Sequence, residues 1–145
     1  MLKGIPSVLS PDLLKVLMEM GHGDEIVLAD GNYFVGGHAP KVVRADGLGI
    51  PELLDAILKF FPLDPYVSHP VALMQVTPGD PVKTPIWDEY KNIIRKYNPD
   101  FTETEHMERF AFYERARKAY VTITTGERAL YANILLKKGV ITEAL

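Results

Sequence analysis

Apolar and polar positions along the chain follow one another in segments that predict an α/β domain. Ser10-Pro11-Asp12 provides a helix N-cap, a proline for the first turn and an early acid. Apolar residues then recur at helical spacing, so we expect a helix that runs to about Met20, with Gly21 at its C-cap. Ile26–Ala29 is continuously apolar, which is typical of a short strand covered on both faces.

The rest of the chain continues this alternation of helices and strands. We expect further strands at 41–45, 71–76, 120–125 and 131–139, and helices at 51–61, at 85–97 and in the second half of 102–118. Residues 31–40 form a loop rich in turn-forming residues, and loops that leave strands often carry function. There is no internal repeat or linker. The pattern therefore predicts a single domain over residues 1–145, with helices on both faces of a sheet.

Composition narrows the range of functions. The net charge of −3 argues against a nucleic-acid partner. The chain has no cysteine, which excludes disulfides, thiolate nucleophiles and cysteine-ligated metals. No apolar run approaches the ~20 residues of a membrane helix, and Met1–Ser10 lacks the apolar region of a signal peptide. We therefore expect a cytoplasmic protein without a membrane or nucleic-acid partner.

The segment from Gly21 to Gly31 contains the first candidate chemistry. His22 lies in a turn between two glycines, and Asp30 follows the strand that this turn opens. A nearby helix C-terminus favours an imidazolium, which suits a proton carrier. The two side chains bracket one strand, so they can share a site only if the turn folds back or a second chain supplies one of them. The alternative interpretation is a helix–turn–strand corner with a solvated histidine.

Two C-terminal motifs are candidates for binding a polyhydroxyl ligand. Arg109 is followed by several aromatic residues, and guanidinium groups donate to hydroxyls while aromatic faces pack on sugar C–H surfaces. Tyr131 and Asn133 are two residues apart, so they would face the same side of the last expected strand. The alternatives are an amphipathic helix with i,i+4 charge pairs, to which we assign Arg115, and a polar edge strand.

The four histidines do not have the spacing of a metal site. His22, Asp24 and Asp30 lack convergent spacing, and no His-x-x-x-His pattern occurs. We expect His38, His69 and His106 to be surface or loop residues. There is also no phosphate-binding or dinucleotide-binding motif, so we expect no metal and no cofactor.

Several motifs, in order along nearly the whole chain, resemble the RbsD/FucU family, which includes L-fucose mutarotase and D-ribose pyranase. They are Gly21–Val27, Val43–Gly47, Arg109–Ala116, Thr125–Ala129 and Tyr131–Gly139. The resemblance implies a three-layer α/β/α fold with a mixed central sheet. It also implies ring-shaped homo-oligomers, such as a decamer, with monosaccharide sites between subunits, and a cofactor-free isomerase that interconverts sugar anomers.

The same resemblance implies roles for individual residues. The family's catalytic histidine matches His22, and its sugar-binding residues match Asp30, Arg109, Tyr131 and Asn133. The implied reaction is acid/base opening and reclosure of the ring of L-fucose or a related pyranose or ribose. Two other functions stay open on the sequence alone: a sugar-binding or regulatory module without turnover, and a metal-dependent aldolase or isomerase.

Overall fold

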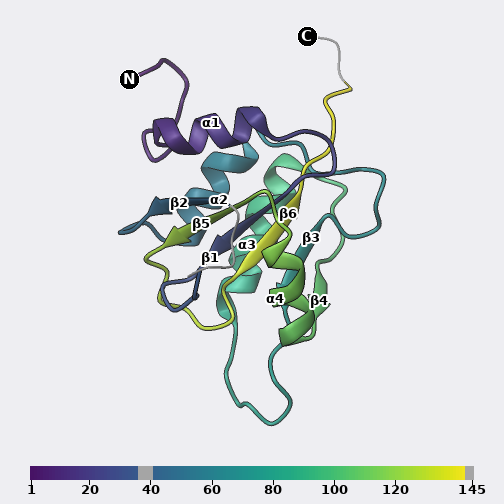
Figure 1. Cartoon of the computed structure of the whole chain (residues 1–145). Coiled ribbons are helices and arrows are strands. Elements are labelled where there is room, and N and C mark those ends of the chain that lie inside the picture. The colour runs from purple at the N-terminus through teal and green to yellow at the C-terminus, as the bar shows by residue number, and fades with distance from the viewer. Residues whose placement is uncertain (36–40, 143–145) are drawn as a thin grey trace.

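The computed structural model describes residues 1–35 and 41–142 of the chain (Figure 1). The helices are α1 (Pro11–Glu19), α2 (Ile50–Leu58), α3 (Pro85–Tyr97) and α4 (Arg109–Arg117). The strands are β1 (Glu25–Ala29), β2 (Val42–Ala45), β3 (Val71–Met74), β4 (Glu105–Met107), β5 (Val121–Thr125) and β6 (Ile134–Lys137). All four helices and every strand except β4 fall where the sequence pattern predicts them.

The strands form one mixed sheet in the order β2-β5-β1-β6-β3-β4. β6 is antiparallel to both of its neighbours, β1 and β3, whereas the other pairs are parallel. The beginning of β6 therefore lies at the same edge of the sheet as the ends of β1 and β3. Ligands of open α/β sheets usually bind at this edge, where the parallel strands end.

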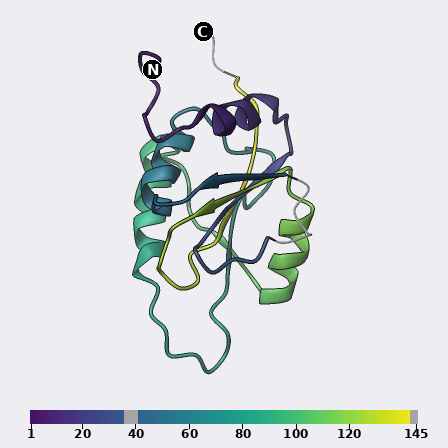
Figure 2. The ribbon, with the colours of Figure 1, turned by 60° about the vertical axis from the view of Figure 1, so that its left-hand side comes forward.

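Helices cover both faces of the sheet, as the sequence predicted. Alternate residues of β1 belong to different cores: Ile26 and Leu28 pack in the larger core with α1, α2 and α3, while Val27 and Ala29 pack in a smaller core with α4. Figure 2 shows α2 and α3 on one side of the sheet and α4 on the other. The three-layer arrangement with a mixed central sheet is therefore confirmed.

One strand and one strand boundary differ clearly from the sequence-based prediction. β4 was not predicted, because it has only three residues, Glu105–Met107, and lacks apolar alternation. The last strand starts at Ile134 rather than at Tyr131, since Tyr131 has a φ of 56°, which a β-strand does not accommodate. Tyr131 and Asn133 therefore lie in the connection before β6 and not on the strand.

Candidate functional site

A cavity of about 240 Å³ lies at the edge of the sheet where the parallel strands end. Asp30 comes from the end of β1, Arg109 from the start of α4, and Tyr131 and Asn133 from the connection into β6. Four of the five residues proposed from the sequence thus line one cavity, although they come from three distant segments. Further residues of the lining include Tyr33, Tyr113 and Asp80.

Asp30 is a buried residue in the lining of this cavity. One oxygen, Oδ1, accepts a hydrogen bond from the backbone N–H of Asn32 at 2.9 Å, which is a local turn at the end of β1. Burial raises the pKa of the Asp30 carboxyl above its ordinary value, and the nearby Glu127 adds to the effect. The other oxygen, Oδ2, remains an acceptor for a ligand hydroxyl.

Asn133 is buried beside Asp30 with a fixed orientation. Its Oδ1 accepts the backbone N–H of Asp30 at 2.7 Å, so the amide nitrogen is the part of this side chain that can donate to a ligand. Asp30 and Asn133 therefore offer an acceptor and a donor side by side. This pairing suits a sugar hydroxyl, which can both donate and accept.

Tyr131 is held by polar contacts on both its backbone and its phenol. The indole N–H of Trp87 donates to the carbonyl oxygen of Tyr131 at 2.8 Å. The phenol Oη donates to Oδ2 of Asp80 at 2.6 Å and accepts the backbone N–H of Thr77 at 3.3 Å. These contacts stabilise a backbone conformation that non-glycine residues rarely adopt.

Arg109 is the first residue of α4, where Glu108 caps the helix through its side chain. A cation at a helix N-terminus is electrostatically unfavourable, so helix stability does not explain an arginine here. No Asp or Glu in the described ranges forms an ion pair with Arg109; its guanidinium instead lies 5.8 Å from the ring centroid of Tyr113. Its donors are therefore available to a ligand in the cavity.

Arg115 has a structural role, as the sequence suggested, but with different partners. It contacts Glu25 of β1 at 2.6 Å and Glu105 of β4 at 2.9 Å, rather than a residue four positions away on its own helix. The short-range pair of α4 is Arg117 with Glu114. Arg115 therefore connects α4 to β1 and β4 through ion pairs and does not line the cavity.

His22 lies at the opposite end of β1 from the cavity. Its ring nitrogen Nε2 is 3.2 Å from Oδ1 of Asp64, its ring packs against Tyr66 at 5.5 Å, and 47% of its side chain is exposed. Five residues of strand span roughly 16 Å, so His22 and Asp30 do not meet within one chain. Of the two arrangements that the sequence left open, the turn does not fold back over the sheet.

Asp64 was not singled out in the sequence, where it is a loop residue between two prolines with no motif around it. Only 3% of its side chain is exposed, and it accepts both His22 and the backbone N–H of Tyr66. Burial alone would raise the pKa of Asp64, but these two hydrogen bonds, together with the charges of His22 and Lys137, outweigh burial and hold the pKa below its ordinary value. An ionised Asp64 therefore orients the His22 ring.

The other histidines do not join this site in the part of the chain that is described. His106 lies on β4, with its ring 4.8 Å from that of Trp87, and burial lowers its pKa. His69 lies in the loop before β3, and His38 is outside the described residues.

Within residues 1–35 and 41–142, no three His, Asp or Glu side chains are grouped as metal ligands would be. Among the same residues, the helices are too short or too polar to span a bilayer.

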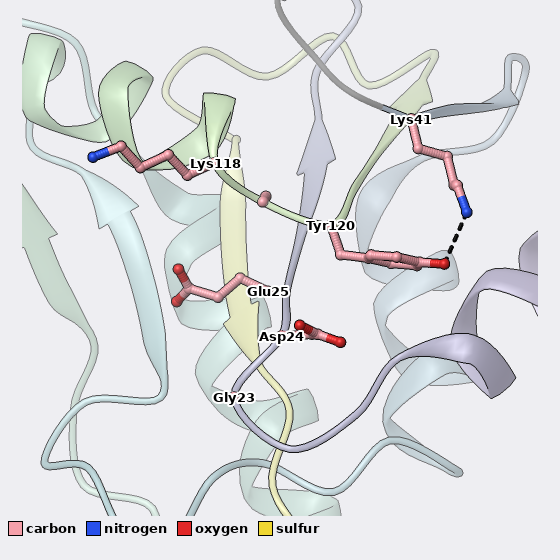
Figure 3. A pocket seen from close by; sticks show the side chains of 7 residues that line it. Gly23, Asp24, Glu25, Lys41, Lys118 and Tyr120 are labelled. Atoms are coloured by element: carbon pink, nitrogen blue, oxygen red, sulfur yellow. Dashed lines mark hydrogen bonds between the residues drawn. The ribbon is translucent and has the colours of Figure 1, made fainter.

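A second hollow, of about 370 Å³, is less suited to a sugar (Figure 3). It lies beside the start of β1 and β5, and most of its charged groups already have partners: Lys41 donates to the phenol of Tyr120 at 2.8 Å, and Glu25 binds Arg115. Asp24 accepts the backbone N–H of Gly21. The cavity around Asp30 offers more uncommitted donors and acceptors.

Comparison with known proteins identifies the family. The model of the RbsD / FucU transport protein family matches residues 3–141. The chain belongs to the RbsD/FucU family. This confirms the resemblance drawn from the sequence motifs.

Individual members of the RbsD/FucU family are similar over nearly their whole length. The chain is 51% identical to the fucose mutarotase of Homo sapiens, over 97% of this chain and 94% of that protein. It is 49% identical to the L-fucose mutarotase of Actinobacillus pleuropneumoniae, over 97% of each chain. The crystal structure of the fucose mutarotase of Streptococcus pneumoniae in complex with L-fucose is 52% identical, with a TM-score of 0.92 over 97% of this chain and 100% of that one.

Proposed function

We propose that this protein is an isomerase of the L-fucose mutarotase type, which interconverts the α and β anomers of L-fucose without a cofactor. The observation that carries the proposal is the meeting of Asp30, Arg109, Tyr131 and Asn133 in one polar cavity. Relatives of about 50% identity over nearly the whole chain are fucose mutarotases, which supports the same substrate.

The proposed reaction needs only proton transfers. A base removes the proton from the anomeric hydroxyl while an acid delivers one to the ring oxygen, and the bond between C1 and the ring oxygen breaks to give the open-chain aldehyde. The bond between C1 and C2 rotates, and the released hydroxyl adds to the other face of the aldehyde. No electrons are transferred, so no redox group is required.

Within this scheme His22 is the acid/base group, held by the ionised Asp64. Asp30 accepts a ligand hydroxyl, Arg109 and the amide of Asn133 donate to others, and Tyr131 positions the ring. Positioned acid/base groups contribute about 10²–10⁴-fold to a rate. The aromatic faces of Tyr33 and Tyr113, whose centroids are 5.8 Å apart, provide apolar surface for the C–H side of the sugar.

Because His22 lies at the other end of β1, we propose that it serves the cavity of a neighbouring subunit. The surface around His22 has an apolar groove of about 450 Å³ next to Met18, which is 85% exposed. The surface near the cavity has Phe110, which is 71% exposed, and Leu130. Two different apolar surfaces on one chain favour head-to-tail contacts, and such contacts close into rings when the rotation permits.

Exchange NMR on L-fucose tests the function directly. Wild-type protein should accelerate exchange between the anomeric signals, and His22→Ala should lose about 10²-fold or more of that rate, whereas the control His69→Ala should retain it. Binding of fucose without acceleration would instead establish a sugar-binding module. Measurements with ribose and galactose define the range of substrates, and cell fractionation tests the cytoplasmic location expected from the sequence.

A further inference from the structure

A segment outside the motifs of the sequence analysis contributes to the cavity. Residues 75–84 connect β3 to α3 and project from the body of the domain as the long loop below the sheet in Figures 1 and 2. Asp80 of this loop lines the cavity beside Tyr131. Nothing in its sequence context, a turn with Gly79, distinguishes Asp80 from an ordinary loop acid.

Both carboxylate oxygens of Asp80 act as acceptors. Oδ1 accepts the backbone N–H of Val82 at 3.1 Å, which is a local turn, and Oδ2 accepts the phenol proton of Tyr131 at 2.6 Å. A phenol has a single proton, so Tyr131 has no second one to donate. Its oxygen also accepts the backbone N–H of Thr77, so one lone pair of the oxygen is left without a partner among these contacts.

We infer that Asp80 is a positioning residue that accepts the only phenol hydrogen bond that Tyr131 can donate. Tyr131 then presents only an acceptor to the ligand. The ligand group at this point must then be a hydrogen-bond donor. For a monosaccharide it is a hydroxyl that donates to Tyr131, and a derivative without a proton at that position binds more weakly. This inference rests on the proposed function, because it deepens how the same cavity recognises its sugar.

Asp80→Asn tests the inference because the two carboxylate oxygens both accept hydrogen bonds, whereas an amide has one oxygen that accepts and one nitrogen that donates. The turn N–H of Val82 favours the amide oxygen, which leaves the NH₂ group to donate to the oxygen of Tyr131. The phenol O–H then no longer has an acceptor on residue 80 and can donate to the ligand. Tyr131 therefore changes from a hydrogen-bond acceptor for the ligand to a donor. Asp88→Asn, the same chemical change at an exposed acid of α3, is the matched control.

The first measurement needs no sugar. In protein labelled with ¹³C at the phenol carbon of tyrosine, the Tyr131 signal is identified by its absence in Tyr131→Phe. This signal should move in Asp80→Asn and stay fixed in Asp88→Asn. An unmoved signal in Asp80→Asn would mean that Asp80 does not hold the phenol in solution, and the inference would be overturned.

The second measurement compares affinities for L-fucose with those for its monodeoxy and monodeoxyfluoro derivatives. In wild-type protein one fluoro position should cost roughly five- to tenfold in affinity, the value of one lost hydrogen bond, and Asp80→Asn should reduce this penalty to about twofold or less. If Asp80 only stabilises the loop, Asp80→Asn should lower the affinity for every ligand by the same factor. That result would refute the inference that Asp80 makes Tyr131 an acceptor. Failure of wild-type protein to bind any of these sugars would instead refute the proposed function, and the sugar-free signal would still decide the Asp80–Tyr131 pair.

Discussion

The backbone N–H of Asp30 donates to the side-chain oxygen of Asn133 at 2.7 Å, which joins two residues that are 103 positions apart in the chain. This bond fixes which end of the Asn133 amide can meet a ligand. It also ties the end of β1 to the connection before β6, so the two strands and the cavity are held together by the same contact. Sugar binding and local order at this edge of the sheet are therefore linked.

The first prediction is that Asp30→Asn separates binding from stability. Because burial raises the pKa of Asp30 in the folded state, ionisation of this group at neutral pH opposes folding. The amide can still accept the N–H of Asn32, so thermal unfolding at pH 7 should occur at the same or a higher temperature. L-Fucose affinity should fall by about tenfold or more, because an ionised acceptor for the sugar is lost. Normal affinity in the variant would mean that Asp30 only caps the end of β1.

The second prediction concerns acid stability at Asp64. Its pKa is depressed in the folded state, so its contribution to stability is present above the ordinary carboxyl pKa and is lost as pH falls through the folded value. Asp64→Asn should therefore destabilise the protein at pH 6, and its deficit relative to wild type should shrink between about pH 5 and pH 3. Denaturation curves across this range measure the effect. A deficit that stays constant with pH would show that the charge of Asp64 is not what stabilises the fold.

The third prediction tests the packing under His22. Gly139 packs so closely on residues 63–64 that an added Cβ would lie 2.5 Å from the carbonyl oxygen of Leu63 and 2.7 Å from Cα of Asp64. Gly139→Ala should cost about 1–3 kcal/mol of unfolding free energy through overpacking. It should also lower anomer exchange, because the backbone that carries Asp64 must shift. Gly21→Ala is the control, since its new Cβ would meet nothing closer than 3.8 Å, and equal stability of the two variants would contradict the argument.

The fourth prediction is that chelation leaves the activity unchanged. The proposed ring opening moves protons only, and His22 with the polar cavity accounts for each transfer without a Lewis acid. Exchange rates measured before and after dialysis against EDTA should agree. Activity that is lost on dialysis and restored by one divalent ion would support the metal-dependent isomerase that the sequence alone left open.

The helices and the central strands could be predicted because their signals are local. A Pro-initiated helix start at Ser10-Pro11-Asp12 and a fully apolar run at Ile26–Ala29 each depend on residues close in sequence. β4 could not be predicted in this way, because three residues gain strand structure only by pairing with β3 at the sheet edge. The prediction that Tyr131 lies on the last strand was wrong for a related reason. The positive φ of Tyr131 is maintained by contacts with Trp87 and Asp80, which are distant in sequence.

The candidate site shows the same division. Arg109, Tyr131 and Asn133 could be proposed from their chemistry and from family motifs, and they do line one cavity with Asp30. Asp64 and Asp80 were missed because each is a single acid in a loop whose partner, His22 or Tyr131, is more than forty positions away. The separation of His22 from Asp30 depends on the turn geometry, which the sequence left open.

The last prediction follows from that separation. If His22 serves the cavity of the next subunit, His22→Ala and Tyr131→Ala remove residues that belong to one site but to different chains. Mixed oligomers, made by dissociating and reassembling the two inactive variants together, should then contain some sites with both substitutions and some with neither. With random mixing at equal amounts, about a quarter of the sites are intact, so about a quarter of the wild-type exchange rate should return. The control is each variant taken through the same procedure alone, which should stay inactive. If both residues came from one chain, no site in a mixed oligomer would be intact and no activity would return, and a fully active monomer in sedimentation would equally exclude a shared site.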